Sequence, residues 1–294
     1  MKPSLLKICY VLFFGASVSL GFTQGIDETS LVKNFFYNAD TLSFGGAGRA
    51  TYSSGQNMIL NPAAIARHKN KVSFGGSYMS AGATSSSPWS LFATDYRASQ
   101  ALSFGAFYGY DKATIEGTEA KINYAAIALA KDVTKNFFIG TNIKAYKTKY
   151  SGMQTGGPDG VDADLGIQFK PSDYLSLGFT MNHIFQGKNF EEFPLLIAGG
   201  VALELEGTGK LLVDLENDLS KTNGDSFNAY FGGEVFLMDG FFLRGGFGID
   251  NVRDADFFSA GLVLQGPKIN MVGVYSQTVE PVDKTFGVSV DVLF

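Results

Sequence analysis

Hydrophobic and polar residues alternate along most of the chain after about residue 72. Residues 286–294 alternate between apolar and small or polar side chains, and residues 161–169 and 175–181 repeat the pattern. A period of two predicts β-strands with one apolar and one polar face. The whole chain read in this way predicts fourteen strands: 72–80, 88–97, 101–110, 121–131, 137–148, 161–170, 174–185, 195–206, 210–217, 227–237, 241–250, 256–265, 268–278 and 285–294. Most have the length of about ten residues that a tilted membrane strand needs.

The links between these strands differ in length at alternate positions. Tight turns are predicted after every even strand, as at 132–136 and 238–240, and longer polar loops after most odd strands, including 111–120 and 149–160. Aromatic residues fall near both ends of the strands, as at the two interfaces of a bilayer. Short turns on one rim and long loops on the other are typical of outer-membrane barrels, whereas a soluble sandwich or propeller gives no reason for this sorting. We therefore expect an all-β fold, a closed antiparallel transmembrane barrel of about fourteen strands.

The first residues predict export. Lys2 and Lys7 precede an apolar run at residues 8–14, which small residues follow, as in a secretory signal peptide. We predict a signal peptide over 1–21, with cleavage after Gly25 and an uncleaved anchor as alternatives. The single cysteine, Cys9, lies inside it, so the predicted mature chain has no thiol for a disulfide, a nucleophile or a metal site. A net charge of −5 without a basic cluster predicts no nucleic-acid partner.

The stretch 41–67 follows neither a strand pattern nor a clean helical one. It combines Gly45, Gly46 and Gly48 with an Asn61-Pro62 turn, yet it is apolar enough to need burial. An irregular buried segment needs a surrounding structure that satisfies its backbone groups. We therefore predict three parts: the signal peptide, a hatch or plug over 22–70 inside the barrel, and the barrel itself over 71–294.

Candidate chemistry is sparse. The inward faces of the predicted strands carry ionisable residues: Lys144, Asp162, Asp164, Lys170, Glu204, Glu206, Asp214, Glu216, Glu234, Arg244 and Asp291. Glu234 and Arg244 are expected to pair on neighbouring strands, either as a latch for the plug or as ordinary paired charges of the lumen. Four aromatic residues are predicted to point inward and to line a ligand pocket: Phe92, Phe107, Tyr146 and Tyr230.

Catalytic and cofactor sites are not predicted. The chain has two histidines, and His183, expected at the surface or the membrane interface, lacks a nucleophile that can be placed beside it. Gly46-x-Gly48 lacks the third glycine and the βαβ context of a dinucleotide loop. Asp159, Asp162 and Asp164 do not have the spacing of an established calcium loop. We predict no enzyme, no metal and no cofactor.

Phe44–Ala50, followed by Asn61-Pro62-Ala63-Ala64-Ile65-Ala66, resembles the hatch of the FadL-type long-chain fatty-acid transporters. It is equally similar to that of their PorV-like relatives in type IX secretion. The resemblance implies a plugged fourteen-strand barrel in the outer membrane, with Gly45, Gly46, Gly48, Asn61 and Pro62 shaping the plug. It implies passive uptake of hydrophobic small molecules such as long-chain fatty acids, with outer-membrane lipid as the surroundings. The alternative is a PorV-like scaffold that holds secreted or envelope proteins. The sequence departs from the family where Ser53-Ser54-Gly55 replaces an acidic residue and where the outer loops are short.

Overall fold

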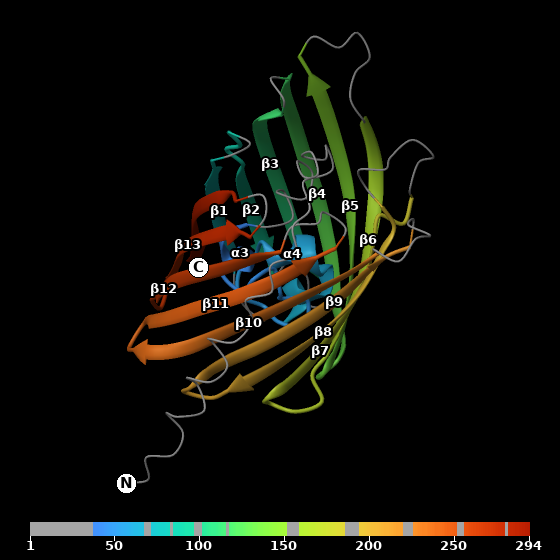
Figure 1. Cartoon of the computed structure of the whole chain (residues 1–294). Coiled ribbons are helices and arrows are strands. Elements are labelled where there is room, and N and C mark those ends of the chain that lie inside the picture. The colour runs from blue at the N-terminus through green and yellow to red at the C-terminus, as the bar shows by residue number, and fades with distance from the viewer. Residues whose placement is uncertain are drawn as a thin grey trace.

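The computed structural model describes residues 38–67, 72–82, 85–96, 102–115, 118–151, 159–185, 194–219, 226–251, 256–279 and 282–294. Fourteen antiparallel strands form one closed barrel, in which each strand pairs with its neighbours in sequence and β1 pairs with β14 (Figure 1). The predicted antiparallel barrel is therefore confirmed. The predicted signal peptide at 1–21 lies outside the described residues, so it and the three-part division stay predictions.

The strand bounds follow the predicted ones closely. The strands are β1 Val72–Ala81, β2 Trp89–Asp95, β3 Ser103–Ile115, β4 Thr118–Thr134, β5 Phe137–Tyr150, β6 Asp159–Phe169, β7 Leu175–Asn182, β8 Leu196–Leu205, β9 Gly209–Asp218, β10 Phe227–Met238, β11 Phe241–Asp250, β12 Phe257–Gln265, β13 Ile269–Thr278 and β14 Lys284–Leu293. Antiparallel pairing leaves the described wall without an open edge, which a sheet in lipid requires.

The predicted loop at 111–120 is wrong. β3 and β4 continue through most of it and pair as far as Ile115 and Thr118. The polar composition of this stretch is typical of a loop, but its residues lie on β3 and β4, which together with β5 extend beyond most of the other strands (Figure 1). Strand residues that leave the membrane face water, so they can be polar without leaving the sheet. The inward position predicted for Glu206 is also wrong, because this residue lies exposed in the turn after β8.

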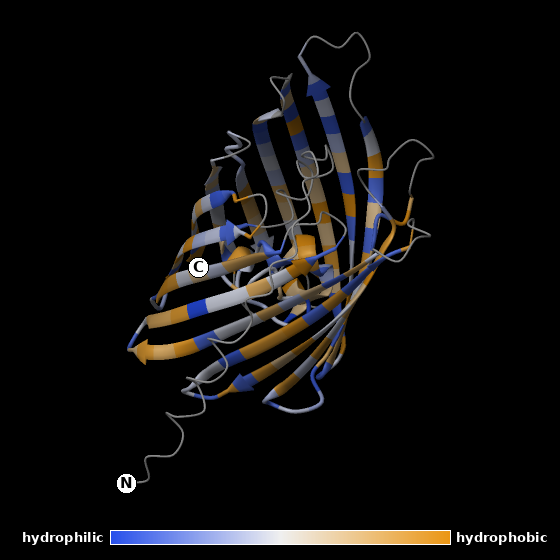
Figure 2. Ribbon diagram, viewed as in Figure 1, coloured by the Kyte–Doolittle hydropathy of each residue, from blue (hydrophilic) through white to orange (hydrophobic). Residues whose placement is uncertain are grey.

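The two faces of the wall differ in chemistry. Large apolar side chains lie exposed on the outer face along the strands, for example Ile143, Leu177, Leu215 and Val288. Their inward neighbours are small or polar and are buried. Figure 2 shows hydrophobic and hydrophilic residues alternating along the strands. An apolar outer surface of this extent is unfavourable in water, and it matches the lipid-facing band of a membrane barrel.

Residues 38–67 lie inside the barrel (Figure 1). They form three short elements: α3 Ala39–Leu42, α4 Asn57–Leu60 and the 3₁₀ turn η1 Pro62–Ala66. Within the described residues, no helix is long and apolar enough to cross a membrane. We call residues 38–67 the inner segment.

Candidate functional site

The inner segment holds its shape through local caps and glycine turns. Asn38 accepts a hydrogen bond from the Thr41 amide at 2.9 Å and caps α3. The Asn61 side chain accepts one from the Ala63 amide at 3.0 Å, and Pro62 occupies the first position of η1. Gly45 has a φ of 65°, a conformation that favours glycine. The predicted turn at Asn61-Pro62 is thus the start of η1.

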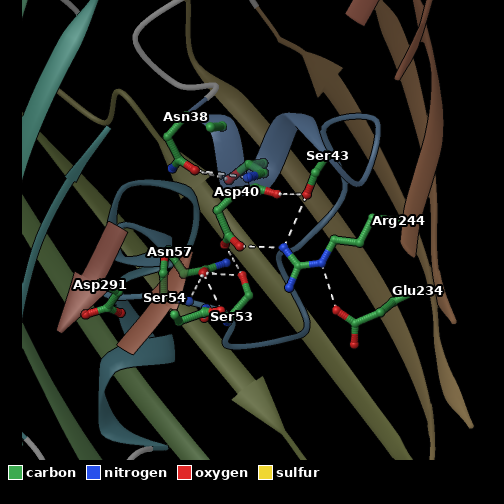
Figure 3. A network of polar contacts seen from close by, with 12 residues as sticks. Asn38, Asp40, Ser43, Ser53, Ser54, Asn57, Glu234, Arg244 and Asp291 are labelled. Atoms are coloured by element: carbon green, nitrogen blue, oxygen red, sulfur yellow. Dashed lines mark hydrogen bonds and ion pairs between the residues drawn. The ribbon is translucent and has the colours of Figure 1, made fainter. Parts of the chain in front are cut away.

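Arg244 on β11 joins the inner segment to the barrel wall (Figure 3). Its Nη1 donates to Asp40 Oδ1 of α3 at 2.6 Å, and its Nε donates to Glu234 Oε2 of β10 at 2.7 Å. The guanidinium carbon also lies 4.1 Å from the ring centre of Phe44, within reach of a cation–π contact. The predicted Glu234–Arg244 pair is therefore formed, and it continues to a third charge on the inner segment.

Arg49 makes the reverse contact, from the inner segment to the wall. Its guanidinium bonds to Glu216 and lies 3.4 Å from Asp214 Oδ2, both on β9. The backbone amides of Gly48 and Arg49 each donate to the same Asp214 oxygen at 2.9 Å. Both carboxylates are buried, and burial of a charge carries a large desolvation penalty. These hydrogen bonds and ion pairs offset that penalty.

The other half of the inner segment packs by shape rather than by charge. The element η1 lies against β4, β5 and β6. A Cβ on Gly140 of β5 would lie 2.5 Å from the Ala63 nitrogen, so glycine is needed for the two backbones to touch. Asn142 of β5 donates to the Met58 carbonyl at 2.6 Å, and Asn61 donates to the Ile167 carbonyl at 3.1 Å.

The four predicted ligand residues all point inward, with exposures of 1–6%. Phe92, Phe107 and Tyr146 belong to one buried apolar cluster, together with residues of α4 and η1. Tyr230 belongs to a second cluster, where it lies beneath the Arg49 guanidinium. The structure therefore brings three of the four together and separates Tyr230 from them.

The apolar cluster continues along the inner face of β4 beyond the inner segment. Every second residue of β4 from Ala120 to Ala130 is buried: Ala120, Ile122, Tyr124, Ala126, Ala128 and Ala130. A Cβ on Gly105, opposite Ala128, would meet Met58 and Ile65 of the inner segment. Phe107 packs edge-to-face on Tyr124 with ring centres 5.7 Å apart. A buried apolar face thus runs from the inner segment to the extended end of the wall.

The expected surface position of His183 is wrong. His183 follows β7 with a φ of 63° and is buried, with Nδ1 2.8 Å from Asp162 Oδ2. Lys144 donates to Asp164 Oδ1 at 2.6 Å, and the same oxygen accepts the His183 amide at 3.0 Å. β6 and β7 pair only from Leu165 to Phe169, so these side chains hold β7 to β6 where the backbone ladder ends.

The three aspartates weighed as a calcium site do not converge. Asp162 and Asp164 point into the barrel, whereas Asp159 is half exposed and lies 3.6 Å from Lys147 on the outer face. The Asp162 and Asp164 carboxylates instead bond to Lys144 and His183 and hold β7 to β6.

Burial changes the acidity of two groups on the inner segment. Burial raises the pKa of the Tyr52 hydroxyl well above its usual value, and the neighbouring Tyr96 hydroxyl, to which it hydrogen-bonds, adds to the shift. Burial lowers the pKa of the Arg67 guanidinium, while Glu204, 3.5 Å away, opposes that shift. Tyr52 is therefore neutral, and it bonds to the wall as a hydroxyl rather than as a charge.

Solved structures share this architecture, although no family model and no curated protein matches the chain. The toluene transporter TbuX of Ralstonia pickettii has a TM-score of 0.64 and 12% identity over 87% of this chain and 97% of its own. The monoaromatic hydrocarbon channel CymD gives 0.65 and 12% over 87% and 96%. A FadL homologue of Pseudomonas aeruginosa gives 0.58 and 12% over 87% and 98%.

The chain has a FadL-like outer-membrane transporter fold. A closed barrel of this fold with a lipid-facing outer surface lies in the outer membrane. The names of these neighbours describe transporters and channels rather than enzymes. The PorV-like relationship and its secretion or envelope partners receive no support from these structures, so they stay predictions.

Proposed function

We propose that this protein is an outer-membrane channel for the passive uptake of hydrophobic small molecules. The observation that carries the proposal is the apolar inner face of β4, which leads from the extended rim of the barrel to the inner segment. Ligand pockets are mostly apolar with few polar groups, and this surface has that composition. The neighbours named for toluene and monoaromatic hydrocarbons, and the FadL homologue, add support from the fold.

In this mechanism, the molecule enters at the rim that carries the longer links and moves along the β4 face. Phe107 and Tyr146 contact it, and Phe92 does so near the inner segment. The inner segment then shifts to open the path. Its charged contacts to β9, β10 and β11 hold α3 and the glycine turns in the closed position, and these contacts break when this half moves. The element η1 packs on the β4–β6 side without ion pairs to those strands in the described residues. We propose that the glycine turns at Gly45, Gly46 and Gly48 allow this shift.

The test is uptake by Gram-negative cells whose own FadL-type channels are deleted, because the lipopolysaccharide leaflet slows hydrophobic compounds. Cells that make the protein should accumulate radiolabelled toluene or oleate faster than cells with the empty vector. A labelled sugar that does not use the same path serves as control. Equal accumulation of both hydrophobic compounds with and without the protein would refute the proposal.

The two compounds also separate the ligand classes. Uptake of oleate would support long-chain fatty acids, the class implied by the sequence resemblance. Uptake of toluene alone would place the ligand among small aromatic compounds. A variant with Ala126 changed to Phe narrows the β4 face, so it should slow the compound that uses this path and leave sugar uptake unchanged.

A further inference from the structure

Three lysines lie side by side on the outer face of the extended part of the wall. Lys112 of β3 is directly opposite Lys121 of β4, and Lys121 is directly opposite Lys149 of β5. All three point away from the lumen, since their neighbours Ala113, Ala120 and Thr148 are buried. The Lys112 and Lys121 side chains are 48% and 42% exposed. We call Lys112, Lys121 and Lys149 the lysine row.

Among the residues that the structure describes, the lysine row carries more positive charge than its carboxylate neighbour compensates. Glu119 pairs with Lys112 at 2.5 Å and with Lys121 at 2.7 Å, so one carboxylate serves two ammonium groups. Among the described residues, no carboxylate pairs with Lys149. Like charges directly opposite each other on neighbouring strands destabilise a sheet. Three lysines in register therefore indicate an anionic partner outside the chain.

The position of the lysine row relative to the membrane identifies that partner. The next pairs toward the membrane are Trp89 with Tyr110, and Tyr110 with Asn123, on the same outer face. Trp89 packs on Tyr108 and Tyr110 with ring centres 5.5 and 6.0 Å apart. Trp and Tyr mark the level of the lipid headgroups in membrane proteins. The lysine row lies two residues, roughly 7 Å, farther out.

Below this aromatic level the same strands are apolar. Ile127 of β4 and Ile143 of β5 are more than half exposed, at 53% and 60%, on the face that carries the lysines. The outer face thus changes continuously from apolar side chains, at the level of the acyl chains, through aromatic residues to lysine ammonium groups. A lipid with an anionic headgroup matches this order along its own length.

We propose that the lysine row binds the phosphorylated headgroups of outer-leaflet lipids. A phosphate has several acceptor oxygens, so it can bridge neighbouring ammonium groups and remove their mutual repulsion. The contact fixes the extended β3–β5 wall at the level of the headgroups. It does not depend on what the barrel transports.

Trp89 is the only tryptophan of the chain, so its fluorescence reports on the lipids next to the lysine row. The purified protein is reconstituted into phosphatidylcholine vesicles that contain a small, equal fraction of one brominated lipid. The brominated lipid is either phosphatidic acid, with a phosphomonoester headgroup, or phosphatidylcholine. Bromine on the acyl chains quenches tryptophan at short range. We expect stronger quenching by brominated phosphatidic acid, and equal quenching by the two lipids would overturn the proposal.

Three substitutions on exposed side chains test which charges matter. Each lysine near an anionic membrane surface strengthens binding by roughly 1 kcal/mol, which raises the binding constant for the anionic lipid roughly fivefold. Lys149→Gln should therefore lower the local enrichment of phosphatidic acid by about this factor, and Glu119→Gln should raise it. Lys131→Gln, on the outer face of β4 near its opposite end, should leave it unchanged. An equal effect of Lys131→Gln and Lys149→Gln would show general surface charge and would overturn the proposal.

Inorganic phosphate distinguishes a lipid site from a site for free phosphate. Millimolar phosphate in the buffer should leave the preference for brominated phosphatidic acid in place, because the lipid is anchored at the site by its chains. Loss of the preference under these conditions would overturn the assignment to a lipid headgroup.

Discussion

Replacing Arg244 with methionine removes the cation that joins the inner segment to β10 and β11. The change keeps most of the side-chain volume, and it leaves the Asp40 and Glu234 carboxylates, 1% and 6% exposed, without their shared partner. Removing one member of a buried ion pair costs about 3–5 kcal/mol. This loss destabilises the docked position of α3 and of the turn after it. In that turn, the Gly45 amide also donates to Ser259 Oγ of β12 at 3.1 Å.

Hydrogen exchange of the protein in lipid nanodiscs measures this change. A cost of about 3–5 kcal/mol predicts exchange of the α3 amides that is faster by roughly a hundred- to a few thousand-fold. Amides of β4 and β5 should be unaffected, because their ladder does not involve Arg244. A change of less than threefold, roughly 0.6 kcal/mol, in α3 would refute the anchoring role of Arg244.

Two further variants serve as controls for this prediction. Lys210→Gln removes a charge that lies 3.5 Å from the same Glu234 carboxylate but is 27% exposed, so it should cost about 1 kcal/mol or less. Asp40→Asn keeps the Arg244–Glu234 pair. In the double variant of Arg244→Met and Asp40→Asn, the two costs should not add, because the two residues contact each other directly.

Three other substitutions test separate contacts. Gly246→Val places a side chain where the Gly45 backbone lies, so it should displace the inner segment and make it sensitive to protease while the barrel stays folded. Asp164→Asn leaves buried Lys144 without its carboxylate, and the midpoint of heat unfolding in detergent should fall by several degrees; an unchanged midpoint would contradict the role of this pair. Asn61→Ala removes the cap of η1 and should cost about 1 kcal/mol, measured as faster exchange of the η1 amides.

The sequence predicts the wall well because the wall repeats. A period of two determines both the strands and the face on which each residue lies, so Glu234 and Arg244 could be assigned to facing positions on neighbouring strands before any contact was known. The structure shows these two residues directly opposite each other. Asp40, the third member, could not be predicted in this way. It lies 204 residues from Arg244, and no periodic pattern places the inner segment against a particular strand.

His183 shows why the ends of strands are harder to predict. Its place at the end of a predicted strand suggested the surface, yet the chain turns inward there. The cause is local. Asp162 and Asp164 lie on the neighbouring strand β6, and their carboxylates accept hydrogen bonds from the backbone amides of Phe185 and His183, respectively. Hydrogen bonds between side chain and backbone at an irregular position leave no repeat in the sequence. Arg49 also lies in an irregular segment, so no repeat in the sequence identifies it as an anchor.

Movement of the inner segment is the central claim, and a reversible cross-link tests it most directly. A Cβ at position 287 of β14 would lie 3.2 Å from the Cβ of Ala39 in α3, close to the roughly 3.5–4.5 Å found in disulfides. In the predicted mature chain, which lacks Cys9, the variant with Ala39→Cys and Gly287→Cys contains no other thiol. Cells that carry this variant should take up the labelled hydrophobic compound slowly when oxidised and at the wild-type rate after reduction. Equal uptake in both states, with the disulfide shown to form, would contradict a path that opens by movement of α3.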